Sequence, residues 1–439
     1  MLRRVLLLLL LAALAGAEPA GAQLLSARRM AMGGVILAGG GPGSDAANVA
    51  YRGVPPAPNS GSGITLPIGI IPVLSDPPEF DPDKPEFNIY ELANLAYNPP
   101  WNLQLVTPDP PANDISIAVG KDHLAVDLGD VKSIFPENHT RAGSILNGPA
   151  PGIGIRRFFV AVAPLVYYEN DLSFSDELQA AIHGAEFTPN TSYSMHDEAH
   201  GIAAAGVHLG WAGPLVRHGD PRHGGTGLYA GARVKLMRGL ALGEAENGVA
   251  FTTADTLFAS EPVDVRYTGH YFDAGPDGGR FGRGFDVGTV WVGGGFEVGV
   301  GVNDLGTRFD WRARESVASS DTTTGETVQQ VIARDRAYSN SVPTTITGNV
   351  AARLGRFLVA ADVVRGVWAT TGHLGAETWF GPVPLRGGLY LDANRLVQYT
   401  GGSGIRIGSF GLDLALATNS RNLSRERGLE LGAGLTFYR

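Results

Sequence analysis

Residues 428–439 read Gly-Leu-Glu-Leu-Gly-Ala-Gly-Leu-Thr-Phe-Tyr-Arg, and their pattern indicates the class of fold. Apolar side chains take every second position from Leu429 to Phe437, with small or polar residues between them. Such alternation predicts a β-strand with one apolar and one polar face, which a soluble β-sandwich also contains. Most strands expected after residue 285 repeat it. Small and charged residues on one face, opposite an apolar band, are typical of a transmembrane β-barrel.

Residues 1–22 have the features of a secretory signal peptide. Two arginines precede a short leucine-rich core at residues 5–17, and Ala-Gly-Ala at 20–22 offers small residues for cleavage. We expect cleavage after Ala22, which changes the formal net charge from −9 to −10. No later stretch approaches the roughly 18 apolar residues of a membrane helix. Residence in a membrane would therefore require a closed barrel.

The composition excludes several classes of protein. The chain has 439 residues, of which 61 are glycine and only 18% are charged. It contains no cysteine, so disulfides and thiolate metal sites are excluded. The negative net charge makes nucleic acid a poor partner, because binding to phosphates depends on basic residues.

We expect three parts: a signal peptide (1–22), a hatch or periplasmic segment (23–113), and an outer-membrane β-barrel of about 14 strands (114–439). A short helix is expected at 87–97, and Ser175 is expected to cap a helical turn ending at Ile182. The remainder of 172–200, most of 241–284 and 316–341 lack the alternation, so loops are expected there, with one short strand near 263–271. Strands are expected at 115–120, 123–131, 153–168, 201–211, 227–240, 285–291, 296–302, 346–354, 357–364, 373–380, 385–392, 404–408, 410–417 and 428–437.

Two short motifs follow the leader. Residues 27–35 read Ala-Arg-Arg-Met-Ala-Met-Gly-Gly-Val, and residues 45–50 read Asp-Ala-Ala-Asn-Val-Ala. Together they resemble the mature N-terminus of the long-chain fatty acid outer-membrane transporters (FadL-like proteins) and their relatives, which include outer-membrane secretion components and a TraF-like group. In that family the second motif usually reads Asn-Pro-Ala, whereas Asn-Val-Ala stands here. The resemblance implies a hatch inside the barrel, with candidate hatch residues Arg28, Arg29, Met32, Gly33, Gly34, Asp45 and Asn48.

One set of charged residues falls on the face opposite the apolar band. If the apolar face meets lipid, these side chains point into the lumen, where both signs of charge can pair with one another or with the hatch. We interpret them as a salt network that fixes the hatch, with a substrate path as the alternative. The candidate lumen-facing residues are Asp286, Glu297, Arg353, Asp362, Arg386, Asp392, Arg406, Asp413 and Glu430.

A histidine pair is the one motif that suggests metal chemistry. Residues 196–200 read His-Asp-Glu-Ala-His, but a zinc protease needs glutamate directly after the first histidine, and Glu198 stands one place later. We therefore expect a solvated loop here. A looser metal site formed by His196, His200, His218 and His223 is the alternative.

By resemblance, the expected function is uptake or capture of hydrophobic small molecules such as fatty acids, in the bacterial outer membrane. No catalytic residue, metal or cofactor is expected. The expected partners are membrane lipids and a hydrophobic ligand, and not nucleic acid. A second hypothesis is a barrel that anchors or docks a protein partner in a secretion or envelope assembly without transport. A third is a secreted soluble β-protein.

Overall fold

The computed structural model describes residues 27–35, 44–56, 61–65, 103–106, 116–120, 123–127, 139–147, 152–182, 185–255, 264–320, 327–391, 397–418 and 428–438. The expected signal peptide and the expected helix at 87–97 lie outside these residues. Among the described residues, no helix has the length and hydropathy needed to cross a membrane.

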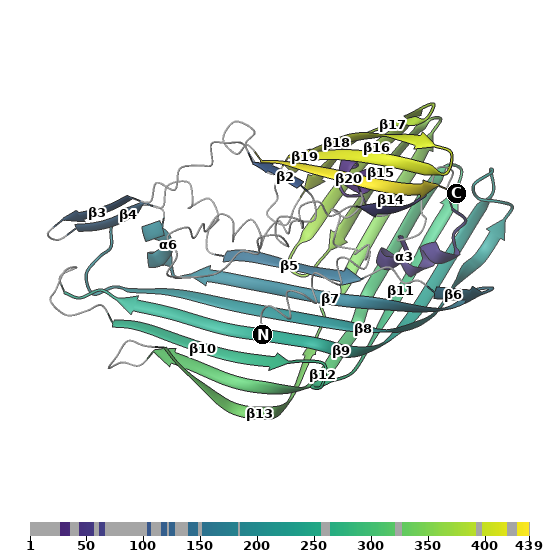
Figure 1. The fold of residues 1–439 in the computed structure, drawn as a ribbon. Coiled ribbons are helices and arrows are strands. Elements are labelled where there is room, and N and C mark those ends of the chain that lie inside the picture. The colour runs from purple at the N-terminus through teal and green to yellow at the C-terminus, as the bar shows by residue number, and fades with distance from the viewer. Residues whose placement is uncertain are drawn as a thin grey trace.

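One antiparallel sheet contains most of the described strands (Figure 1). A separate hairpin of β3 (Ser116–Gly120) and β4 (His123–Asp127) lies near the short helix α6 (Asp176–Ile182). The strands of the main sheet are β1 (Gly61–Thr65), β2 (Leu103–Val106), β5 (His139–Asn147), β6 (Gly152–Ile155), β7 (Phe158–Phe174), β8 (Ser192–His218), β9 (Thr226–Thr252), β10 (Asp264–Ala274), β11 (Gly279–Gly293), β12 (Phe296–Ser320), β13 (Thr327–Ser341), β14 (Thr345–Leu354), β15 (Phe357–Arg365), β16 (Thr370–Phe380), β17 (Val383–Leu391), β18 (Val397–Ile407), β19 (Phe410–Thr418) and β20 (Gly428–Tyr438).

The strands pair mainly with their neighbours in sequence, from β5 and β6 beside β7 to β1 and β2 beside β20. Two strands, β10 and β13, depart from this order because each pairs with only part of a long neighbour. β9 pairs with β11 along its first half and with β10 along its second half. β12 pairs with β14 along its first part and with β13 along its second part. With β10 and β13 set aside, and β1–β2 and β5–β6 each taken as one position, the described sheet has fourteen positions. The expectation of about 14 strands agrees with this number.

Side-chain burial shows which face of the sheet looks outward. Leu412, Leu414 and Leu416 of β19 are 45%, 49% and 47% exposed, whereas Asp413 between them is 1% exposed. The same inversion recurs in β12, where valines are exposed and Glu297 is buried. A soluble sandwich would bury the apolar rows, so the soluble hypothesis is wrong. The fold is an all-β transmembrane barrel with its apolar face toward lipid.

The apolar band ends before several strands do. On the outward face of β12, Arg308, Asp310 and Arg312 are exposed where valines stood earlier in the strand. These strands therefore continue beyond the lipid, at the end of the barrel opposite the tight turns at 294–295, 355–356 and 408–409. We call these the extended end and the short-turn end. Long connections face the exterior in such barrels, which places the extended end outside.

Three loop expectations are wrong for the same reason. Residues 192–200 belong to β8, residues 241–252 to β9, and residues 316–320 and 327–341 to β12 and β13. Beyond the lipid band the outward face no longer meets hydrocarbon, so polar residues occupy it. The alternation that predicts a strand is therefore missing.

The strand expected at 153–168 is divided in the structure. Arg156 has a φ of 58°, and the turn at 156–157 reverses the chain between β6 and β7. Ile155 and Phe158 face outward on either side of the turn, so the apolar run conceals the reversal. The helical turn is confirmed as α6, where the Ser175 hydroxyl accepts a hydrogen bond from the Leu178 N–H at 3.3 Å.

The N-terminal residues lie inside the sheet. They form α2 (Ala27–Ala31), α3 (Ser44–Ala47) and the 3-10 helix η2 (Val49–Gly53). α2 contacts β17 to β20, whereas η2 contacts β8, β9 and β11, and α3 contacts β12. Because these short elements touch strands from both halves of the sheet, the sheet curves round them (Figure 1). We call residues 27–35 and 44–56 the hatch.

Candidate functional site: the plugged lumen

The lumen is layered, and the inward face of β9 passes through its layers in order. Gly231 contacts the hatch at Val49, and Arg233 belongs to a buried ion cluster. Met237 lies in an apolar cluster, and Glu244 lies in a polar wall nearer the extended end. The sequence of layers is therefore hatch, charge, apolar cluster and polar wall.

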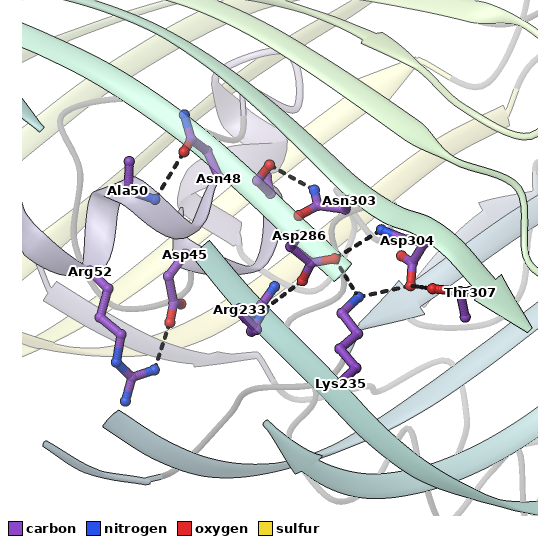
Figure 2. A network of polar contacts seen from close by, with 11 residues as sticks. Asp45, Asn48, Ala50, Arg52, Arg233, Lys235, Asp286, Asn303, Asp304 and Thr307 are labelled. Carbon is purple, nitrogen blue, oxygen red and sulfur yellow. Dashed lines mark hydrogen bonds and ion pairs between the residues drawn. The ribbon is translucent and has the colours of Figure 1, made fainter. Parts of the chain in front are cut away.

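The ion cluster consists of two cations and two carboxylates (Figure 2). Asp286 accepts from Arg233 Nε at 2.5 Å, from Lys235 Nζ at 2.9 Å and from the Asp304 N–H at 2.8 Å. Lys235 Nζ also contacts Asp304 Oδ1 at 2.8 Å, and Thr307 donates to that oxygen at 3.2 Å. The four charged residues and Thr307 are at most 3% exposed. The opposite charges are therefore neutralised by one another and not by solvent.

A second ion cluster ties α2 to the opposite wall. Arg28 donates to both carboxylate oxygens of Glu377, at 2.9 and 2.8 Å. Arg386 donates to Glu377 at 2.8 Å and to Asp413 at 2.6 Å, and Thr436 donates to Asp413 at 2.5 Å. A two-pronged arginine–carboxylate contact fixes orientation as well as position. α2 is therefore held in one register against β16.

Polar side chains of the wall also hold the hatch backbone. Gly33 N–H donates to Thr400 Oγ1 at 2.8 Å, and its carbonyl lies 2.9 Å from Nδ1 of His373. Asn303 Nδ2 donates to the Ala47 carbonyl at 2.7 Å. At the short-turn end, Arg222 donates to the Pro55 carbonyl at 2.9 Å. These contacts satisfy hatch groups that water would otherwise have to reach.

Close approach of backbone to backbone requires glycine at the contact of hatch and wall. Gly33 has a φ of 68°, and a Cβ there would lie 2.3 Å from the Leu389 carbonyl oxygen. On the wall, a Cβ at Gly388 would lie 2.2 Å from the Gly33 nitrogen. Any larger residue at either position would separate the two surfaces.

An apolar cluster lies between the ion cluster and the extended end. It includes two large aromatic residues of β12, Phe309 and Trp311, which are 0% and 2% exposed. Its other members are Ile145, Leu165, Tyr167, Ile202, Ala204, Met237, Leu242, Ala274, Ala313 and Val342. Apart from Val342, which follows β13, these residues lie on strands of the sheet that also carries Arg233 and Lys235, so the interior is not polar throughout.

The polar wall begins directly beyond the apolar cluster. Trp311 Nε1 donates to Asn340 Oδ1 at 2.9 Å, and Asn340 Nδ2 donates to Glu244 at 2.8 Å. Tyr338 also donates to Glu244, and His200 Nδ1 lies 3.4 Å from it. The aromatic and carboxylate groups thus form one hydrogen-bonded boundary.

The structure brings several of the predicted lumen-facing residues together and separates others. Asp286, Arg386 and Asp413 belong to the two ion clusters, and Glu297 accepts from Arg222 at 2.5 Å. Asp362 is 2% exposed and lies 3.9 Å from His373. The remaining four predicted residues are not members of either ion cluster. Arg353 and Arg406 lie near the short-turn ends of β14 and β18, Asp392 lies outside the described residues, and Glu430 pairs through its backbone with Ala417.

The candidate hatch residues have different surroundings. Arg28 pairs with the wall, whereas Asp45 pairs with Arg52 of the hatch itself at 2.8 Å. The buried Asn48 caps η2 by accepting from the Ala50 N–H at 3.0 Å, and it donates to the Thr289 carbonyl at 3.2 Å. Met32 and Gly34 are buried, and Arg29 is half-buried in the middle of α2.

Sequence reasoning missed Arg233, Lys235, Asp304 and Glu377. The signal was present for the first two, because Tyr229, Gly231, Arg233 and Lys235 alternate with apolar residues. Lysine and arginine at alternate positions of an apolar strand indicate an inward row in a barrel. The partners of these residues on other strands could not be read from one strand.

The four-histidine metal site is wrong. His196 and His200 lie on β8 near the extended end, whereas His218 ends β8 and His223 follows in the turn. Eighteen residues of strand separate His200 from His218, which corresponds to about 60 Å. The expected solvated loop is also wrong, since residues 196–200 are strand.

No protein-family model matches the chain, and no curated protein matches it. Among solved structures, the CymD monoaromatic hydrocarbon channel aligns over 69% of this chain and 87% of its own, with 12% identity and a TM-score of 0.31. The Pseudomonas putida toluene transporter TodX aligns over 70% and 90%, with 12% identity and a TM-score of 0.28. A variant of the Rhodopseudomonas blastica porin aligns over 68% and 99%, with 8% identity and a TM-score of 0.24. At such scores the barrel assignment rests on the strand pairing and burial of this chain.

Proposed function

We propose that this protein is a bacterial outer-membrane barrel that takes up or captures hydrophobic small molecules, with fatty acids as the finer hypothesis. The observation that carries the proposal is the apolar cluster around Phe309 and Trp311. A water-filled channel has a polar interior, whereas this lumen has aromatic and aliphatic side chains on the exterior side of a hatch. Apolar lining with a few polar groups at its edge is the usual composition of a small-molecule site.

The proposed path has a defined order. A ligand enters from the extended end, passes the polar wall at Glu244, and replaces side-chain contacts in the apolar cluster. The hatch and its ion clusters then separate the ligand from the short-turn end. Passage requires the hatch to move, whereas capture does not.

The test compares two adjacent residues of β9. Met237→Glu places a carboxylate in the apolar cluster, whereas Arg238→Glu changes an exposed outward residue next to it. Uptake of radiolabelled oleate and of toluene is measured in cells that express each variant, and barrel folding is checked by heat-dependent gel migration. We expect Met237→Glu to reduce uptake at least about tenfold, which corresponds to about 1.4 kcal/mol. Equal uptake by the two variants would refute the proposal.

One observation favours docking as a second function. Within the described residues β13 pairs only with β12, and Val328, Val331 and Ile332 are exposed. An exposed strand edge is a template for a strand from another chain. The test is co-purification of an envelope protein that Val331→Lys abolishes without reducing oleate or toluene uptake. An unchanged complex in Val331→Lys would refute docking at this edge.

A further inference from the structure

The inward face of the extended end carries a row of ionisable side chains in register. Asp171 of β7 lies opposite Glu198 of β8, and Glu198 lies opposite Glu246 of β9. Glu246 lies opposite His270 of β10. His196 shares this face because it stands two positions from Glu198 on the same strand.

Three of these side chains bring their ligand atoms close together. One nitrogen of His196 and one oxygen each of Glu198 and Glu246 lie within 4.8 Å of one another. The contact between His196 Nε2 and Glu198 Oε1 is 3.1 Å. Ligand atoms bound to zinc at about 2.0–2.2 Å lie about 3.3–3.6 Å apart in a tetrahedron. Small rotations of half-exposed side chains are enough to reach that spacing.

The arrangement also places like charges together. Carboxylates directly opposite one another on neighbouring strands destabilise a sheet, and Glu198 faces Glu246 in this way. The next row toward the membrane differs, because His200 lies between two glutamates, at 3.4 Å from Glu244 and 3.7 Å from Glu169. A cation between Glu198 and Glu246 would supply the compensation that histidine supplies in the neighbouring row.

We propose that His196, Glu198 and Glu246 bind a divalent first-row transition metal ion at the extended end. Neutral imidazole favours zinc, copper or nickel over calcium and magnesium, which prefer oxygen ligands alone. Three protein ligands leave a further position for water, as in open zinc sites. The ion joins β8 to β9 beyond the membrane and neutralises the carboxylate pair at the mouth of the barrel. This site is independent of the proposed uptake of hydrophobic molecules.

The test uses the full-length protein purified in detergent, without a polyhistidine tag and after dialysis against EDTA. Co²⁺ binding is followed by visible absorption, and Zn²⁺ affinity is measured by displacement of Co²⁺. The variants are His196→Gln and Glu246→Gln, whose side chains lie outside the ion clusters and the apolar cluster. His223→Gln is the matched control, because His223 is exposed in the turn after β8 and pairs with Asp220.

We expect His196→Gln and Glu246→Gln each to weaken Zn²⁺ binding at least about tenfold, and His223→Gln to bind as the unaltered protein does. X-ray absorption of the zinc-loaded unaltered protein should show one imidazole with oxygen ligands. The proposal is overturned if the unaltered protein binds no Zn²⁺ at about 1 mM. It is equally overturned if both ligand variants bind normally, if His223→Gln weakens binding to the same extent, or if two or more imidazoles are found.

Discussion

Neutralising Asp286 tests the role of the ion cluster in holding the lumen together. Arg233, Lys235, Asp286 and Asp304 carry balanced formal charge with almost no exposure to water. Asp286→Asn leaves one excess positive charge, and Arg233 loses the carboxylate that lies 2.5 Å away. Removing one partner of a buried ion pair costs about 3–5 kcal/mol, because the remaining charge is uncompensated. We expect the free energy of unfolding to fall by about this amount.

A double-mutant cycle identifies charge balance as the cause. Arg233→Met together with Asp286→Asn leaves Lys235 paired with Asp304 at 2.8 Å, so the remaining cluster is neutral again. We expect the double variant to be at least about 1 kcal/mol more stable than Asp286→Asn alone. Stability is measured by urea unfolding of protein refolded in liposomes, followed by tryptophan fluorescence and heat-dependent gel migration.

The control for this cycle is Asp310→Asn. Asp310 faces outward beyond the lipid band, and its 3.8 Å contact with Arg308 is exposed to water. Surface pairs of this kind contribute about 0–1 kcal/mol. The reasoning is refuted if Asp286→Asn costs no more than Asp310→Asn, or if the double variant loses the full sum of the two single losses.

Three further changes test other parts of the structure. Leu414→Arg, on the outward face of β19, should lower the free energy of unfolding in urea by about 2–4 kcal/mol. Val331→Arg on β13 should lower it by less than about 0.5 kcal/mol. Equal losses would contradict the position of the lipid band. Gly388→Val should displace the hatch, because a Cβ at this position would lie 2.2 Å from the Gly33 nitrogen. The conductance of the protein in planar bilayers should therefore rise. Unchanged conductance would contradict a hatch that closes the lumen. Ser175→Ala removes the cap of α6 and should destabilise that helix by about 0.5–2 kcal/mol. The effect should be seen as faster amide exchange in α6 and at Ser194, whose N–H also donates to the Ser175 hydroxyl at 3.3 Å, and nowhere else.

The lipid-facing part of the fold could be predicted because one physical cause produces the pattern. Hydrocarbon outside and charge inside force residues such as Leu414 and Asp413 to alternate, and the alternation is visible in a single strand. Where the strands extend beyond the lipid, the alternation is absent and the strands could not be predicted. The extended parts of β8, β9, β12 and β13 have no lipid on their outward face, so residues 192–200 and 327–341 resemble loops in sequence.

The sequence predicted which side chains of the candidate site face the lumen, but it did not predict which residues pair with one another. The parity of a strand places Asp286 and Asp413 on the inward side, but it does not say that Asp286 meets Lys235 or that Asp413 meets Arg386. Such pairs depend on register between strands and on curvature of the sheet. The metal-binding hypothesis illustrates the same limit, because Glu246 becomes the neighbour of Glu198 only through the register of β8 and β9.

The span of the hatch contacts along the chain has a consequence for biogenesis. Arg28 and Glu377 are 349 positions apart, and the buried contact between Tyr51 and Asn349 spans 298. Contacts that close such long loops have a high entropic cost and form after local hairpins. The hatch therefore reaches its final position only after strands near the C-terminus have formed. Its protection from added protease would mark the completion of folding.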